Sequence, residues 1–91
     1  MIIVSQDKEK IVNFDNLTQV YITQDEEETA YFIRYETVDS LYDDLGEYKT
    51  EERAKEVLAE IIKSYRDYRT AECDGYTNIL QETAVFEMPT E

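Results

Sequence analysis

The sequence predicts an α+β domain, in which a mostly antiparallel sheet of about five strands packs against one long helix. Three observations support this fold class. The first half of the chain contains short runs rich in β-branched and aromatic residues, separated by turn-forming residues. A segment near 50–69 has one apolar stripe at helical spacing, and an apolar run near 83–88 closes the chain. Because 91 residues suffice for only one core, we expect a single domain over 1–91.

The first three apolar runs are predicted to be strands of an antiparallel meander, because only short polar or turn-forming segments separate them. They are Ile2–Val4, Ile11–Phe14 and Leu17–Thr23. In the third run, Val20 and Ile22 share one face, and Tyr21 lies on the opposite face.

The longest predicted strand is Thr29–Val38, and both of its faces are partly apolar. One face carries Tyr31, Ile33 and Tyr35, and the other carries Ala30, Phe32 and Arg34. A strand with this pattern either lies in the centre of its sheet or presents one face to a partner.

Acidic segments flank this strand on both sides. Asp25–Glu28 is a run of four acids, whose mutual repulsion predicts a solvated turn. Asp39–Asp44 is predicted to be a second acidic connection, and Leu45–Tyr48 is predicted to be a short strand or turn.

A helix is predicted from about Thr50 to Arg69. Thr50 is a good N-cap, and Glu51 and Glu52 follow in the first turn, where the helix dipole favours acids. The apolar stripe consists of residues at three- and four-residue spacing, namely Ala54, Val57, Leu58, Ile61, Ile62 and Tyr65. A helix of this length spans about 30 Å, enough to cover one face of a small sheet.

A closing strand is predicted at Thr83–Met88, where Pro89 ends it because proline cannot donate to a strand ladder. The sequence pattern of Thr77–Leu80 does not distinguish a helix from a strand. Met1–Ser5 lacks the basic start and the long apolar stretch of a signal peptide, and no stretch is long enough to cross a membrane. We therefore expect a cytoplasmic protein without a membrane partner.

Charge and composition exclude several functional classes. The chain has 22 acidic and nine basic residues, a net charge of −13, which disfavours direct binding of nucleic acid through phosphates. The absence of histidine excludes Ser-His-Asp triads and histidine metal sites, and a single cysteine excludes disulfides within the chain. Two glycines leave no glycine-rich phosphate loop. No motif supports catalysis, so we expect a protein that is not an enzyme.

The acids and tyrosines indicate a protein-binding surface. Residues 25–52 contain eleven acids and two bases, a net charge of −9. If the acidic segments converge, they can imitate the phosphates of a nucleic acid or steer the chain onto a basic cleft. Eight tyrosines offer large rigid side chains with a polar end, which suit interfaces. The candidate partner-binding residues are Asp25, Glu26, Glu27, Glu28, Tyr31, Tyr35, Asp39, Tyr42, Asp43, Asp44 and Glu47.

Two other interpretations of the acids stay open. Acidic loops can simply keep a small protein soluble. Carboxylates also suit Mg²⁺ or Ca²⁺, and such an ion would be held by Asp39, Asp43, Asp44 and Glu47. The spacing does not match an EF-hand, however, so we predict no metal and no cofactor.

Parts of the chain resemble a family of small uncharacterised proteins from phages, prophages and integrative elements of Gram-positive bacteria. The similar segments are Met1–Lys8, Ile11–Asn16, Leu45–Leu58 and Val85–Pro89. The resemblance leaves out 24–44 and 69–83, which contain eleven of the 22 acids and four of the eight tyrosines. It implies a mobile-element origin and a location in the host cytoplasm, and it transfers no catalytic residue.

Together these features predict a non-catalytic acidic factor that binds a basic or nucleic-acid-binding host protein. An inhibitor of the anti-CRISPR or anti-defence kind, acting by acidic mimicry of nucleic acid, would have this character. The alternative is a small homo-oligomer, such as a homodimer, that sequesters a small ligand such as a nucleotide signal. A small core and a strand with two partly apolar faces motivate this alternative.

Overall fold

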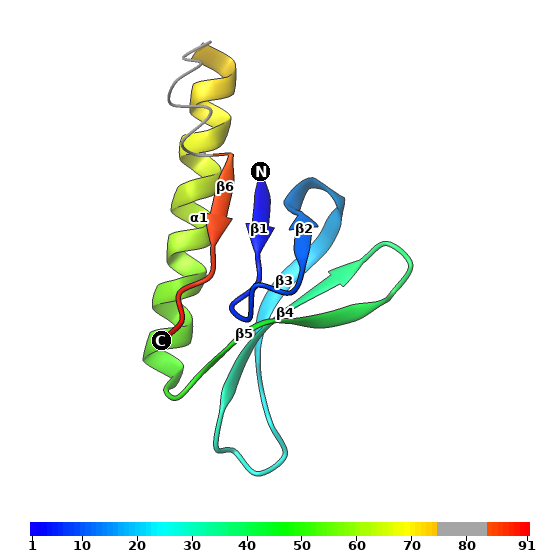
Figure 1. The fold of residues 1–91 in the computed structure, drawn as a ribbon, viewed down its shortest axis with the longest axis vertical. Coiled ribbons are helices and arrows are strands. Elements are labelled where there is room, and N and C mark those ends of the chain that lie inside the picture. The colour runs from blue at the N-terminus through cyan, green and yellow to red at the C-terminus, as the bar shows by residue number, and fades with distance from the viewer. Residues whose placement is uncertain (75–83) are drawn as a thin grey trace.

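Two three-stranded sheets and one long helix make up the part of the chain that the computed structural model describes, residues 1–74 and 84–91 (Figure 1). The chain is therefore of the α+β class, as predicted. In chain order the elements are β1 (Ile2–Val4), β2 (Ile11–Asn13), the 3₁₀ turn η1 (Phe14–Asn16), β3 (Leu17–Gln24), β4 (Tyr31–Thr37), β5 (Tyr42–Tyr48), α1 (Glu51–Asp74) and β6 (Val85–Glu87).

The strands form two sheets rather than the single sheet of about five strands that was expected. One sheet has the order β3-β4-β5 and is an antiparallel meander with β4 in its centre. The other has the order β2-β1-β6, in which β1 is antiparallel to β2 and parallel to β6. In the expected meander of the first three runs, the antiparallel pairing of β1 and β2 is confirmed, but the placement of β3 beside them is wrong, because the chain crosses to the other sheet at η1. The closing strand pairs with the first strand, so the two ends of the chain complete one sheet.

The prediction for the start of α1 is confirmed, and the helix is longer than expected. The Thr50 hydroxyl accepts a hydrogen bond from the Arg53 backbone N–H at 3.1 Å, which makes Thr50 the N-cap. The helix continues to Asp74 rather than ending near Arg69. Residues 70–74 contain neither glycine nor proline, so nothing in this stretch interrupts the helical backbone. The pattern at 77–80 lies outside the described residues.

The core lies where α1 meets both sheets. Ile3, Ile33, Leu45, Val57 and Ile61 are each at most 1% exposed and come from β1, β4, β5 and α1. Burying one such side chain stabilises the fold by about 1.5–3 kcal/mol. Tyr65 and Phe14 stack at the edge of the core, with ring centroids 4.7 Å apart. The core therefore ties β1, β4 and β5 to the buried side of the helix.

The β4–β5 connection differs from the sequence prediction. Residues Asp39–Asp44 were expected to be an acidic connection, but the turn is shorter and β5 begins at Tyr42. Asp43 and Asp44 therefore lie in a strand. Two of the four residues at the tip of this hairpin are apolar, and these two, Val38 and Leu41, are 77% and 68% exposed. None of the helices described is both long enough and apolar enough to cross a membrane.

Candidate partner-binding surface

The β3-β4-β5 sheet has an outer face that points away from the core. Strand register places Tyr21 beside Arg34 and Arg34 beside Asp44, so these three residues form one row of that face. Phe32 and Glu47 are paired in the next row. Tyr42 is paired with Glu36 in the row on the other side. The outer face thus places aromatic rings beside carboxylates.

The inner face of the same sheet contains two of the predicted site residues. Tyr31 and Tyr35 lie on the side of Ile33 and pack against the core cluster. The Tyr31 hydroxyl also accepts a hydrogen bond from the Gln24 amide at 3.2 Å. Most of the contact area of these two tyrosines is therefore used inside the fold. The aromatic residues of the outer face are Tyr21, Phe32 and Tyr42, of which only Tyr42 was a predicted site residue.

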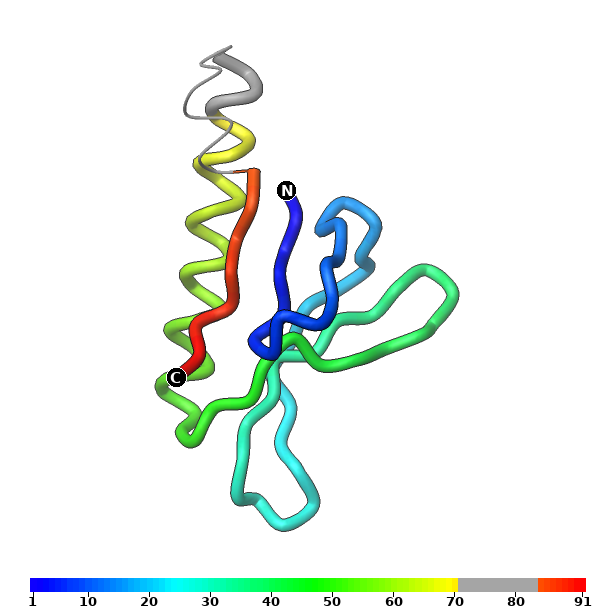
Figure 2. Tube along the Cα trace, in the orientation of Figure 1, coloured from blue at the N-terminus to red at the C-terminus, as the bar shows by residue number. Residues whose placement is uncertain are grey.

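The acidic segments lie at opposite ends of the sheet. Asp25–Glu28 forms the β3–β4 turn, and Asp39 lies in the β4–β5 turn. Figure 2 shows the two hairpins projecting in different directions from the body of the chain. The seven residues of β4 separate the two turns by about 20 Å. Asp39 and the four-acid run therefore do not converge on one patch.

The prediction that Asp25–Glu28 is a solvated turn is confirmed. The Asp25 carboxylate accepts hydrogen bonds from the Thr29 backbone N–H at 2.7 Å and from the Thr29 hydroxyl at 2.6 Å. The bond from the Thr29 hydroxyl is the largest of the effects that lower the pKa of Asp25. Glu28 closes the turn with a left-handed backbone, φ 58°. Asp25 thus fixes the turn, and the side chains of Glu26, Glu27 and Glu28 are exposed at its tip.

Two of the candidate acids are held in ion pairs. Asp43 lies 3.4 Å from the Lys10 ammonium, and Asp44 accepts a 2.8 Å bond from Arg34 Nε. The Asp44 backbone N–H, followed by Lys10, lowers the pKa of Asp43. Carboxylates in such pairs give less negative potential than free ones.

Other candidate acids keep their charge unpaired. Within residues 1–70 and 84–91, no cation pairs with the side chains of Glu26, Glu27, Glu28, Asp39 or Glu47. The unpaired carboxylates therefore lie at the two turns and at the Glu47 end of the outer face.

Arg34 is the central cation of the outer face. Its guanidinium lies over the Tyr42 ring, 4.9 Å from the centroid, while Nε donates to Asp44. The bond to Asp44 raises the pKa of Arg34. The sequence pattern placed Tyr21 on the face opposite Val20 and Ile22, and Phe32 and Arg34 on one of two partly apolar faces, but it did not include these three residues in the site. Their shared alternation with the partly buried Ile22 and the buried Ile33 was the signal that could have grouped them.

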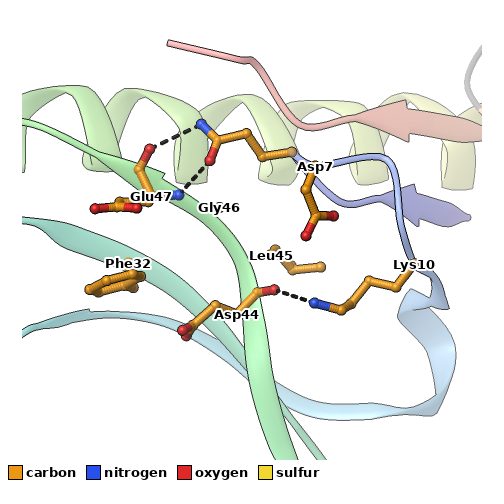
Figure 3. Close-up of a pocket in the computed structure, with 8 residues that line it drawn as sticks. Asp7, Lys10, Phe32, Asp44, Leu45, Gly46 and Glu47 are labelled. Atoms are coloured by element: carbon orange, nitrogen blue, oxygen red, sulfur yellow. Dashed lines mark hydrogen bonds between the residues drawn. The ribbon is translucent and has the colours of Figure 1, made fainter.

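A cavity of about 240 Å³ opens at the Glu47 end of the outer face (Figure 3). Its walls come from the β1–β2 turn and from β4 and β5, and include Gln6, Asp7, Lys10, Phe32, Asp44 and Glu47. In Figure 3, Lys10 reaches the Asp44 carbonyl on one side and Phe32 forms the other side. The register of β5 against β4 shifts between the Ile33–Gly46 pair and the Arg34–Asp44 pair. This shift places Leu45 at the floor of the cavity.

The acidic residues that the structure describes give no arrangement for a metal ion. Across the described ranges, no three histidine, cysteine or carboxylate residues are grouped closely enough to hold one. The four oxygen ligands considered from the sequence are separated, because Asp39 lies at a hairpin tip while Asp43 and Asp44 point to opposite faces of β5.

Comparison with protein-family models, curated proteins and solved structures gives no match to this chain. The resemblance to mobile-element proteins therefore stays a prediction. The surface described above is the basis on which a function can be proposed.

Proposed function

We propose that this chain is a non-catalytic acidic protein that binds a basic or nucleic-acid-binding host protein through the outer face of β3-β4-β5. The observation that carries the proposal is the combination of the exposed Tyr42 ring, the half-buried rings of Tyr21 and Phe32, and unpaired carboxylates on and beside this face. In this proposal the host protein acts in defence or in nucleic-acid handling, and the mobile-element resemblance supports that choice.

The apolar part of the surface supplies contact area. Tyr42 is 64% exposed, and Val38 and Leu41 are exposed beside it at the hairpin tip. Aromatic anchors surrounded by polar residues are typical of the centre of protein interfaces. The outer face together with the β4–β5 tip thus offers a binding centre that a merely solubilising acidic surface does not need.

The acidic part supplies attraction over distance. The net charge of −13 favours approach to a basic surface, and it raises the association rate most at low salt. The free carboxylates of Glu26, Glu27 and Glu28 project at the β3–β4 tip, where a partner covering the outer face can reach them. Imitation of nucleic acid in this proposal depends on charge and aromatic contact together, because the two acidic turns lie far apart.

The proposal is tested by capture from a nuclease-treated lysate of a Gram-positive bacterium, followed by mass spectrometry. The baits are the parent chain, a Tyr42→Ser/Leu41→Ser variant and a Glu26→Lys/Glu27→Lys variant. A control variant, Asp15→Lys/Glu60→Lys, changes the net charge by the same amount on other elements. We expect one nucleic-acid-binding or defence protein to be retained by the parent and the control, and lost by both surface variants.

Two results would count against the proposal. Equal capture by all four baits would show that the outer face and the acidic tip are not used. Capture that does not weaken between 50 and 500 mM salt would remove the electrostatic part, because exposed charges are screened within about 10 Å at 0.1 M salt.

A homo-oligomer that sequesters a small ligand is the second candidate, and a different surface favours it. Ile2, Ile11 and Val85 lie on the same outward face of the β2-β1-β6 sheet and are 41%, 69% and 48% exposed. An apolar sheet face of this kind can be covered by a second copy. Sedimentation of the parent and an Ile11→Lys variant tests this: a dimer that the variant dissociates favours the candidate, and a monomeric parent removes it.

A further inference from the structure

We propose that the cavity beside Phe32 binds the guanidinium group of an arginine side chain on the partner protein. The inference rests on the proposed function, because it names the chemistry by which the partner is recognised. Three features of the molecule support arginine binding: the cavity, its aromatic wall and a guanidinium group that the same face already holds.

The outer face holds its own guanidinium between a ring and a carboxylate. Arg34 lies over Tyr42 at 4.9 Å and donates from Nε to Asp44 at 2.8 Å. The ring attracts the cation through its quadrupole, and the carboxylate accepts a charge-assisted hydrogen bond. Asp44 from the same row and Tyr42 from an adjacent row therefore show how the surface satisfies an arginine.

The neighbouring row offers the same two groups without a cation. Phe32 is paired across the strands with Glu47, and both line the cavity. The Glu47 side chain is exposed and forms no ion pair within the described parts of the chain. Its backbone is fixed along one edge of β5, because the Gln6 side chain accepts from the Glu47 N–H at 2.8 Å and donates to the Glu47 carbonyl at 3.0 Å. The row is thus rigidly placed, and its carboxylate is free.

The size of the cavity and the charge of its walls also suit one basic side chain. The cavity volume of about 240 Å³ is below the roughly 300–1,000 Å³ of pockets for drug-sized ligands. The lining includes the carboxylates of Asp7 and Glu47, which form no ion pair within the described residues, Asp44, which is paired with Arg34, and the cation Lys10. Lys10 is engaged with Asp43 and the Asp44 carbonyl, on the side away from Phe32 (Figure 3). A planar guanidinium suits the site better than an ammonium group, because it can stack on Phe32 while it binds a carboxylate.

The test is a titration of the ¹⁵N-labelled full chain with N-acetyl-arginine amide, followed by amide chemical shifts. N-acetyl-citrulline amide, which has the same shape without the charge, is the matched probe. We expect shifts that saturate at Phe32, Gly46 and Glu47 with the arginine probe and no saturating shifts with the citrulline probe. Glu47→Gln and Phe32→Leu are each expected to weaken binding roughly two- to fivefold.

The control variant is Glu52→Gln, which removes one exposed carboxylate in the first turn of α1 and should leave binding unchanged. Glu47→Gln keeps the exposed side chain nearly isosteric, so a folding defect is not expected to obscure its result. The inference is overturned if the citrulline probe binds equally, if N-acetyl-lysine amide binds more tightly, or if shifts spread over all acidic turns. If the arginine probe binds but the lysate capture fails, the arginine site stands and the proposed host partner is rejected. If the capture succeeds but the arginine probe does not bind, the proposed function stands and the arginine site is rejected.

Discussion

The side-chain amide of Gln6 pairs with the backbone of Glu47 much as a neighbouring strand would. Gln6 Nε2 donates to the Glu47 carbonyl at 3.0 Å, and Gln6 Oε1 accepts from the Glu47 N–H at 2.8 Å. The Gln6 backbone N–H also donates to the Leu45 carbonyl at 2.8 Å. One residue of the β1–β2 turn therefore covers the edge of β5 and joins the two sheets.

Replacing Gln6 by alanine is expected to destabilise the chain by about 1–2 kcal/mol, because several hydrogen bonds are lost together. Gln6 Nε2 also lies within 3.1 Å of the Pro89 and Thr90 carbonyls, so the C-terminal segment loses a contact as well. Urea unfolding measures the change. Gln19→Ala is the matched control, because the Gln19 amide donates to Glu36 within the same strand pair and this bond does not join the two sheets. An equal loss in both variants would show that the link between the sheets contributes nothing of its own.

The β3–β4 turn contains a backbone conformation that glycine would adopt more easily. Glu28 has φ 58°, and its N–H donates to the Asp25 carbonyl at 3.1 Å. A left-handed backbone costs a residue with a side chain about 1–2 kcal/mol. Glu28→Gly is therefore expected to raise stability by about 1 kcal/mol, which corresponds to a Tm about 4–8 °C higher. Calorimetry measures it.

Glu27→Gly is the control for this prediction. It removes the same charge from the same turn, but Glu27 does not have a positive φ. The control should leave Tm unchanged or lower it slightly, because glycine increases the entropy of the unfolded chain. A similar rise in both variants would assign the effect to relief of charge repulsion among the glutamates.

Gly46 lies beneath the ring of Tyr48 on β5. A β-carbon added at Gly46 would lie 2.9 Å from the Tyr48 hydroxyl and 3.0 Å from Cε2. Because Tyr48 is only 2% exposed, its ring has little room to move, and Gly46→Ala is expected to cost about 1–3 kcal/mol. Chemical denaturation of Gly46→Ala, Tyr48→Phe and the double variant measures the coupling of the two sites. Removing the hydroxyl should recover part of the loss, and strictly additive effects would contradict the proposed clash.

The sequence was sufficient for features that depend on neighbouring residues. The Thr50 cap, the buried positions Ala54, Val57 and Ile61, and the acidic turn at Asp25–Glu28 all follow from local spacing, and the structure confirms them. Strand alternation was also correct in β4, where Ile33 is buried and Phe32 lies on the opposite face.

Features that depend on distant contacts could not be predicted. Acids are rare in strands, so Asp43 and Asp44 indicated a loop. In the structure both lie in β5, where their charges are compensated by the cations Lys10 and Arg34 from other segments of the chain. The alternation of β4 could not show which face meets the helix. The tyrosines on the side of Ile33 were therefore assigned to the partner surface although they pack on the core.

Tyr48 gives the chain a pH dependence on the alkaline side. Burial raises the pKa of its hydroxyl from 10.0 to about 12, and the hydroxyl donates to the Pro89 carbonyl at 2.8 Å. In the unfolded chain the group loses its proton near pH 10, whereas the folded chain retains it until about pH 12. The stabilisation is therefore complete below pH 10 and is lost as the pH rises from 10 to 12. A difference of about two pKa units corresponds to roughly 2–3 kcal/mol.

Urea unfolding at several pH values between 8 and 12 tests this dependence. Tyr48→Phe should be less stable than the parent at pH 8 by about 1 kcal/mol, because the bond to Pro89 is lost. The difference should shrink and then reverse as the pH approaches 12, since phenylalanine has no proton to lose. Tyr42→Phe, at an exposed position, should follow the parent throughout. Parallel curves for Tyr48→Phe and the parent would show that the alkaline loss of stability arises from other groups.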